Sequence, residues 1–530
     1  MDSKSLLKRK KKESQIEQNK KTGTKFSFIL KSIFIFIFFL FFLIPTKIKE
    51  VVKENLIFPD LNSNNSKYSK YEQEFKNRNS TCDSFDPINL FKLRIDKGPI
   101  DICSRGKSKH ICYQNINDYY NDIYSHKNGV ICTIENIILD PSKSRQSGIS
   151  YTDGPTDFGH FGFPILYKGF FNANCKANKD INYNGIYKTY FNSWNYDYNI
   201  SEENLEELAP GKIVFFISRN QDSPNLFHGY SEIFNALSMI YLFNLNPEDI
   251  QVVFLESIEI PYYEEVNSSN KDIPRDPFYD IYKKMISKGG EPIYIRNLKK
   301  KYKISKAIHI PINWDSPLFI EVDVPNCDTA TKSYKFFNDF VDKYLDIKPF
   351  KDKFISDNEI FYYPESILKS HESNIHFDKI VTIQWRRVWP KKRRGQARIL
   401  NNGPQLADKL ASVLPKNILI RLVNNAKLKM EEQISLIKST DYLIGMHGAG
   451  LSLSMFLPHN SFLHEVRHTK MIDVLCLMGA LSGHRTFSEE IKNSVSSVNG
   501  NEIVTFDEDD FVNHILQHMK ENKFILINLN

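Results

Sequence analysis

The stretch from Asp441 to Glu465 reads DYLIGMHGAGLSLSMFLPHNSFLHE, and it decides the fold. Its first apolar run, which begins at Tyr442, predicts a buried strand, and a turn of small residues follows. Apolar residues then return at helical spacing until Pro458, and a second apolar run ends at Glu465. This order of strand, turn, helix and strand is typical of the βαβ unit of an α/β sheet.

The small-residue turn is a candidate anion site. Gly448, Ala449 and Gly450 stand where the helix would begin, and Leu451 is its first apolar residue. At that point free backbone N–H groups and the helix dipole favour negative charge, and the missing side chains let a phosphate come close. His447 adds a side-chain donor. The alternative is a tight turn without a ligand, since such turns are common in α/β folds.

Length and charge limit the classes of protein that fit. The chain has 530 residues, of which 41% are hydrophobic, and this is enough for two or three domains. The net charge is +7, but residues 1–31 hold ten Lys or Arg against three acids, so residues 32–530 sum to zero. The bulk charge of the body therefore gives no support to a nucleic-acid or phosphate-polymer binder.

The N-terminus predicts a membrane protein, with a basic cytosolic tail over residues 1–25 and a transmembrane signal anchor over residues 26–45. The apolar segment from Phe26 to Ile44 would span about 28 Å as a helix, close to the hydrocarbon thickness of a bilayer. A cleaved signal peptide is the alternative, but no small-residue cleavage site follows. The preceding Lys and Arg residues would send the rest of the chain into the lumen.

Two further features fit a lumenal body. Sequons for N-glycosylation occur at Asn64, Asn79, Asn199 and Asn267. Five of the seven cysteines fall within residues 82–175, which indicates a disulfide framework in an oxidising compartment. Zinc is the alternative, but the sequence has no Cys-x₂-Cys pair, and we expect no metal.

The rest of the chain predicts an α/β protein with two similar arrays. Residues 46–80 are predicted to be a flexible stem, and residues 81–204 an irregular or β-rich region that holds most cysteines. Apolar strands alternate with amphipathic helices over residues 205–350 and, after a linker at 351–378, again over 379–530. Two such arrays predict two Rossmann-like lobes that face a cleft.

A basic stretch follows the first predicted strand of the second array. Ligands of open α/β sheets bind beyond the carboxyl ends of strands, and arginine forks pair with phosphate oxygens. Arg386 or Arg387, together with Arg398, would therefore clamp a diphosphate. A solvated basic loop and a patch for an acidic partner are the alternatives.

The first array offers candidates for acid–base chemistry. His228 and Glu232 are four residues apart, so they share one face of a predicted helix beyond the end of a strand. A histidine there could act as a base or as a donor to a sugar hydroxyl, and a packed core histidine is the alternative. The sequence lacks a dinucleotide fingerprint, a nucleophile elbow and a P-loop.

These motifs resemble those of glycosyltransferase family 61. The likeness covers roughly residues 205–485 and rests on the turn itself and three weaker elements. They are Asp441–Leu451 with Phe456-Leu457-Pro458 and Glu465, then Glu432-Gln433-Ile434, then Arg398 with Asn401, and Asn225 with His228. This sequence departs from the family at Asn402, where an acid is usual, and at Glu232, where Asp is common. A longer spacing leaves open whether Arg386 or Arg387 takes the first arginine role.

The resemblance implies a GT-B fold and an inverting, metal-independent transferase without a resident cofactor. It implies transfer of a sugar, GlcNAc or xylose, from a UDP-sugar to a glycan or a Ser/Thr hydroxyl. It also implies a single-pass type II protein of the Golgi or endoplasmic reticulum. Arg398 and the turn would hold UDP, Glu465 its ribose, and His228 or Glu232 would face the acceptor. The rival hypothesis is a non-catalytic lumenal glycan-binding or scaffold protein with the same fold.

Overall fold

The computed structural model describes residues 82–525 with gaps, of which the longest are 115–129, 145–165, 256–277 and 388–397. By their contacts, the described residues all belong to one unit. The predicted tail, anchor and stem lie outside the described residues, as do the sequons at Asn64, Asn79, Asn199 and Asn267. Among the helices that are described, none has the length and apolar character needed to span a bilayer.

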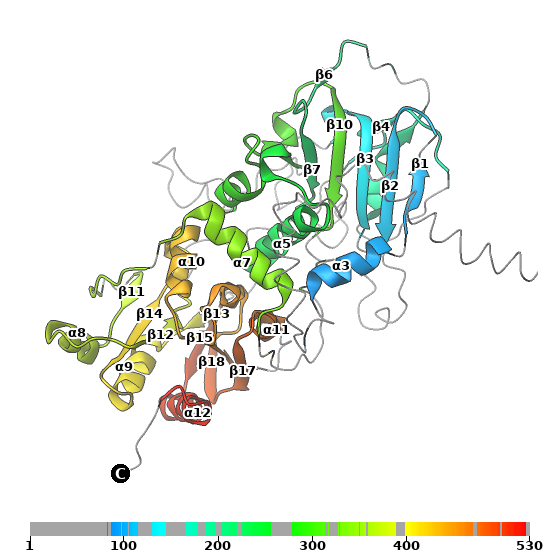
Figure 1. Cartoon of the computed structure of the whole chain (residues 1–530). Helices are drawn as coiled ribbons and strands as arrows, with labels where there is room; N and C mark the ends of the chain where they lie inside the picture. The colour runs from blue at the N-terminus through cyan, green and yellow to red at the C-terminus, as the bar shows by residue number, and fades with distance from the viewer. Residues whose placement is uncertain are drawn as a thin grey trace, which may run out of the picture. The chain divides into compact units, whose positions relative to one another are not determined.

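The first sheet joins an antiparallel part to a parallel part (Figure 1). Its main path runs in the order β1-β2-β3-β10-β7-β8-β9, and the short strands β4, β5 and β6 pair beside it. The bounds are β1 Ile100–Cys103, β2 Lys109–Gln114, β3 Val130–Leu139, β4 Phe171–Ala173, β5 Trp194–Tyr196, β6 Glu206–Glu207, β7 Ile213–Ile217, β8 Ile250–Phe254, β9 Ile293–Tyr294 and β10 Tyr302–Ile310.

The predicted boundary between residues 204 and 205 is wrong, because it cuts this sheet. Strand β10 pairs antiparallel with β3 along its length and parallel with β7 on its other side. The physical reason lies in β3, which is buried along most of its ten residues. A strand buried in this way needs a neighbour on each side, and β10 is one of them.

Helices of the first half pack beside this sheet. They are α3 Pro87–Asp96, α4 Tyr187–Asn192, α5 Leu226–Leu242, α6 Tyr279–Ile281, which continues as a π-helical turn over Tyr282–Ile286, and α7 Lys332–Leu345. The start of α5 is set by Asn225, whose side chain accepts a hydrogen bond from the backbone N–H of Phe227. Helix α5 is almost entirely buried, as expected of a helix covered on several sides.

The second sheet runs in the order β11-β14-β12-β15-β16-β17. All of its pairs are parallel except that of β11 with β14. The strands are β11 Phe361–Tyr362, β12 Lys379–Gln384, β14 Ile418–Val423, β15 Tyr442–Met446, β16 Phe462–Arg467 and β17 Arg485–Glu490. After β12 the chain adds β14 on one side, and it then adds β15, β16 and β17 on the other. The direction of sheet growth therefore reverses between β12 and β15.

Residues 351–378 do not form the predicted linker. They contain β11 and α8 Glu365–Glu372, and β11 is an edge strand of the second sheet. Asp352 also forms an ion pair with Arg421 of β14, with 2.7 Å between its Oδ2 and Nη1, and the Arg421 side chain is fully buried. A buried guanidinium needs a carboxylate partner, and this segment supplies it.

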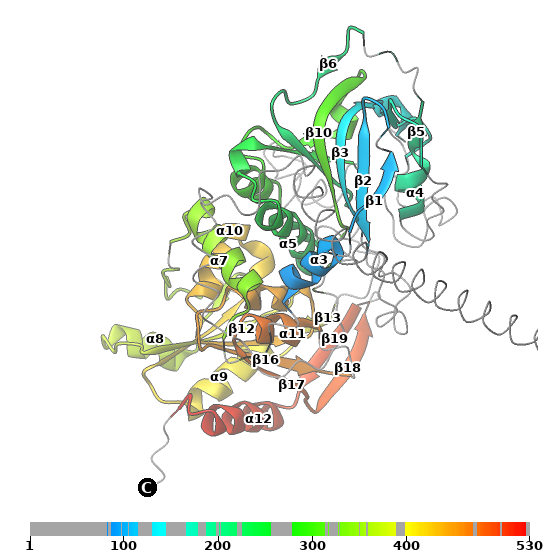
Figure 2. The same cartoon turned by 45° about the vertical axis from the view of Figure 1, so that its right-hand side comes forward.

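A third, smaller sheet completes the C-terminal half (Figure 2). It contains β13 Arg398–Leu400, β18 Asn493–Val498 and β19 Asn501–Phe506, with β19 in the middle. The helices of this half are α9 Gly403–Val413, α10 Met430–Lys438, α11 Val474–Leu481 and α12 Glu508–Glu521. Short 3₁₀ turns occur at Pro141–Lys143, Pro247–Asp249, Ile295–Asn297 and Asn425–Lys427.

Each large sheet has its own apolar core. The two halves also touch through Tyr230 of α5, whose hydroxyl lies 2.8 Å from the sulfur of Met430 and whose ring meets Phe456 edge-on. Three cysteine pairs lie at bonding distance, Cys82 with Cys327, Cys103 with Cys175 and Cys112 with Cys132, while the buried Cys476 is outside these disulfides.

Candidate functional site

The reversal between β12 and β15 places the ends of these two strands side by side. In open α/β sheets, ligands bind in the crevice outside the carboxyl ends of strands at such a switch point. Arg386 comes two residues after the end of β12, and His447 directly follows β15. Two of the predicted site residues are therefore at the place where the topology favours a ligand.

The turn itself is held together by these strand ends. Nη1 of Arg386 donates to the carbonyl oxygen of His447 at 2.6 Å, and Nε2 of Gln384 donates to that of Gly450 at 3.0 Å. Gly448 has a φ of +154°, and a Cβ at this position would overlap the Arg386 guanidinium. The missing side chain at Gly448 thus makes room for an arginine.

The predicted helix after the turn is a 3₁₀ helix, η10, over Ala449–Phe456. The backbone N–H groups of its first residues have no partners within the helix, as at any helix start. Gly448 does not cap them with a side chain. These groups remain suitable donors to an anion, although a 3₁₀ helix has poorer hydrogen-bond geometry than the predicted α-helix.

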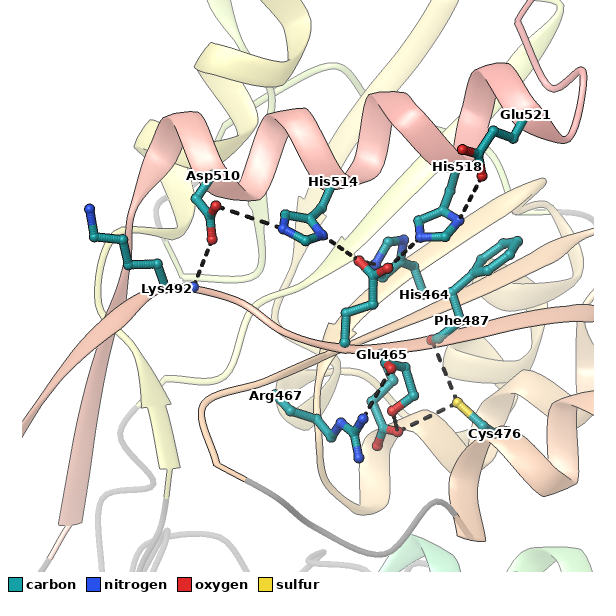
Figure 3. Close-up of polar contacts among 12 residues, drawn as sticks. His464, Glu465, Arg467, Cys476, Phe487, Lys492, Asp510, His514, His518 and Glu521 are labelled. Carbon is teal, nitrogen blue, oxygen red and sulfur yellow. Dashed lines mark hydrogen bonds and ion pairs between the residues drawn. The ribbon is translucent and has the colours of Figure 1, made fainter. Parts of the chain in front are cut away.

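His447 is tied to a buried acid. Its Nδ1 lies 2.5 Å from Oε1 of Glu465, whose other oxygen accepts from the Ser488 hydroxyl at 2.6 Å and faces the Cys476 thiol at 3.4 Å. Figure 3 shows Glu465 and Cys476 facing each other. Burial raises the pKa of Glu465, but the hydrogen bond and charge of His447 and the Ser488 hydroxyl outweigh it, so the pKa is lowered. Glu465 is therefore a fixed negative charge next to the imidazole.

Arg398 approaches from the third sheet. It opens β13, lies opposite Glu502 of β19 and is half-buried. Burial lowers its pKa, while the nearby carboxylates of Glu502 and Glu465 act to raise it. Glu502 also faces His468, with 3.3 Å between its Oε2 and Nε2 of the histidine. Arg398 thus lies within electrostatic reach of the acid that holds His447.

The other predicted donor-site residues lie around this centre. The guanidinium of Arg387 is exposed and stacks 4.4 Å from the ring centre of Trp385. Asn401 is exposed and donates to the Thr505 hydroxyl at 3.1 Å. Asn402, where the family usually has an acid, exchanges two hydrogen bonds with the backbone of Phe506 and joins two strands instead.

His228 and Glu232 lie on α5, which belongs to the first sheet. His228 is half-buried in the first turns of the helix, and Glu232 is buried one turn later. Helix α5 contacts the second half through Tyr230, as described above. The catalytic role of both residues stays a prediction.

Several residues of the site had no distinct sequence signal. Gln384, Cys476 and Ser488 contact the predicted residues directly, but each is a common residue type in an unremarkable context. The position of Ser488 follows from strand pairing, because β17 places it opposite Glu465 of β16. Only a sequence argument that predicted β17 and its register could have found it.

Among the described residues, three side chains of metal-ligating types lie close together in the first half. Ligand atoms of His110, Cys112 and Cys132 lie within 4.8 Å of one another. Cys112 and Cys132 are bonded to each other, however, which leaves a single imidazole. Burial, with a smaller effect of His309, lowers the pKa of His110 to about 3, so this ring stays neutral.

Fold and site together define an α/β protein with a small-residue turn, contacted by an arginine, at the switch point of a mostly parallel sheet. Residues 285–463 match the family model of Glycosyltransferase 61, which spans about a third of the chain. The match contains Arg386, Arg398 and the whole turn from His447 to Leu451. It confirms the resemblance to glycosyltransferase family 61, and the chain is a glycosyltransferase. No curated protein matches the chain.

Proposed function

We propose that the chain transfers a sugar from a UDP-sugar to a hydroxyl of a glycan or of Ser/Thr, with inversion at the anomeric carbon. In this proposal the two large sheets are the Rossmann-like lobes of a GT-B arrangement. The observation that carries it is the joining of Arg386 and His447 at the switch point between β12 and β15. A turn held in this way by a cation is suited to the diphosphate of a sugar donor.

The leaving UDP would be stabilised by fixed donors. As the glycosidic bond breaks, negative charge grows on the phosphate oxygens, and donors placed there in advance lower the barrier. Arg386, Arg398, the backbone N–H groups at the start of η10 and, in the imidazolium form of the ring, Nε2 of His447 are the donors on hand. Such a set can do what a bound cation does elsewhere, so we propose metal-independent chemistry without a resident cofactor.

An inverting transfer also needs a base for the acceptor hydroxyl. His228 and Glu232 remain our candidates, because they are titratable residues on α5, the helix that contacts η10 and α10. GlcNAc and xylose are the donor sugars that we propose first.

The proposed location is the membrane of the Golgi or endoplasmic reticulum, with the catalytic part in the lumen. The three cysteine pairs are compatible with an oxidising compartment. Protease protection in sealed microsomes and a shift on deglycosylation test this orientation. An exposed catalytic part without glycans would contradict it.

Activity is tested with the full chain, purified in detergent, and a panel of UDP-sugars. We expect UDP release with at least one of them and an increase in Tm on addition of UDP. The variants His447→Ala and Arg398→Ala should reduce both responses. If no UDP-sugar is turned over and UDP does not change Tm, the non-catalytic alternative is favoured.

A further inference from the structure

Behind the turn, three side chains form a continuous line of hydrogen bonds. The hydroxyl of Ser488 donates a hydrogen bond to Oε2 of Glu465 at 2.6 Å. Oε1 of Glu465 accepts a hydrogen bond from Nδ1 of His447 at 2.5 Å. Ser488 and Glu465 are opposite each other in the parallel pair β16–β17. The line therefore starts on regular sheet structure and ends at the imidazole in the turn.

Both carboxylate oxygens of Glu465 are already engaged. One oxygen holds His447, and the other holds Ser488 and faces the thiol of Cys476. The residue is completely buried. A ribose could bind this carboxylate only after these contacts were broken, and a charged group that loses its partners in a buried site is strongly penalised. The role in ribose binding implied by the family resemblance thus conflicts with the geometry.

The imidazole itself offers its other edge to the turn. Because Nδ1 is committed to Glu465, Nε2 is the nitrogen that a ligand can meet, and His447 is partly exposed, with 12% of its side chain accessible. Among the described residues, no partner is found for Nε2. In a neutral ring that donates from Nδ1, Nε2 carries no proton, so Nε2 donates to a phosphate in the imidazolium form, in which both ring nitrogens carry protons.

We propose that Glu465 and Ser488 are positioning residues, which hold His447 with Nε2 toward the diphosphate. This inference rests on the proposed function. It gives Glu465 a role in binding the phosphates of the sugar donor, through His447, instead of a role in binding the ribose. The charged groups and histidine near this line include Arg467, which donates to the carbonyl oxygen of Ser488 at 3.0 Å, and also Arg386 after β12, Arg398 of β13 and His468 after β16.

The test measures, by calorimetry on the full chain, the affinity of each variant for each of two ligands. The ligands are UDP and 2′,3′-dideoxy-UDP, which lacks the two ribose hydroxyls. Ser488→Ala and Glu465→Gln should each weaken both ligands by the same factor, about tenfold for Ser488→Ala, since a hydrogen bond to a charged group is lost. Ser488→Thr keeps the hydroxyl and should restore binding, and Ser494→Ala, at an exposed position of β18, should change nothing.

The two hypotheses predict different patterns in this test. If Glu465 binds ribose, Glu465→Gln weakens UDP alone and removes the difference between the two ligands, which overturns the inference. Unchanged binding in Ser488→Ala also overturns it. If the unmodified chain binds neither ligand, the proposed UDP-sugar function fails instead, so the two failures are distinguishable.

Discussion

The contact between Arg386 and the carbonyl oxygen of His447 favours Arg386 over Arg387 as the arginine of the proposed site. The sequence left Arg386 and Arg387 as equal candidates, since they are adjacent and of the same type. In the structure, Arg386 reaches the turn at 2.6 Å, and Arg387 stacks on Trp385 at the surface. The side chains of neighbours that follow a strand end point in different directions, so only the structure separates them.

Replacement of Arg386 should therefore abolish most activity. We expect Arg386→Ala to lower kcat/KM for the best UDP-sugar by about 100-fold, because it removes a cation from the developing phosphate charge. Arg387→Ala is the matched control and should cost less than about threefold. Steady-state assays of UDP release check both. Equal losses in the two variants would show that the clamp involves the exposed residue as well.

The sequence indicated site residues that belong to a recognisable local motif. It missed residues that reach the site through contacts between segments far apart in the chain. His447 and the small residues after it stood out because they follow a predicted strand, where a helix would begin. Ser488 and Gln384 did not, since hydrogen bonds between strands far apart in sequence give no local pattern. The 3₁₀ form of η10 was also missed, because the apolar spacing after the turn also fits an α-helix.

At the scale of elements, β16 and β17 carry different clusters on their two faces. Glu465 contacts His447 of the turn and Ser488, whereas the neighbouring residues His464 and Glu489 point to the opposite face. Figure 3 shows His464 on the side of α12, near His518. The carboxylate of Glu489 accepts hydrogen bonds from Nδ1 of His514 at 2.8 Å and from Nε2 of His518 at 2.5 Å. Nε2 of His464 lies 3.4 Å from the same carboxylate. One carboxylate thus fastens the last helix to the strand behind the site.

Loss of this carboxylate should loosen α12. Glu489→Ala leaves the imidazoles of His514 and His518 without their shared acceptor, which costs about 1–2 kcal/mol and lowers Tm by about 2–4 °C. Glu490→Ala, at the exposed neighbouring position of β17, is the control and should leave Tm unchanged. Thermal unfolding of the three proteins decides the matter, and equal Tm values would contradict the fastening role.

The same cluster predicts a dependence of stability on pH. Hydrogen bonds from His464, then His518 and His514, lower the pKa of Glu489 well below its ordinary value, against the effect of burial. A depressed carboxyl pKa stabilises the fold above the unfolded value of about 4.5 and loses that effect as the pH falls toward the folded value. Tm should therefore fall below about pH 4.5, and the fall should be smaller in Glu489→Gln. Parallel Tm–pH curves for the two proteins would contradict this prediction.

At the scale of the whole molecule, the alternation of strands and helices predicted α/β structure over residues 205–350 and 379–530, and both stretches contain alternating strands and helices. The error concerned what joins them. β3 and β10 pair across about 170 residues of sequence, and local periodicity carries no information on such pairing. The predicted linker was wrong for a similar reason. Asp352 is part of the fold because it pairs with Arg421, which is 69 residues away in the sequence.

Asp352 should behave as a core residue. In addition to Asp352, Arg421 donates to Thr382, Ser439, Thr440 and the carbonyl of Leu436, so removal of the acid leaves a buried positive charge among neutral acceptors. Asp352→Ala should cost about 3–5 kcal/mol and lower Tm or the yield of soluble protein, whereas Lys351→Ala, at an exposed position, should not. Two equally stable variants would restore the linker interpretation.

The central claim is that the turn between β15 and η10 holds the diphosphate of a sugar donor. It is tested most directly by titrating UDP into the full chain and into Arg386→Ala, with Arg387→Ala as the control. We predict saturable binding to the unmodified chain and to the control, and a loss of about 100-fold in affinity in Arg386→Ala. Equal UDP affinity in all three proteins, or no binding in any, would contradict the claim.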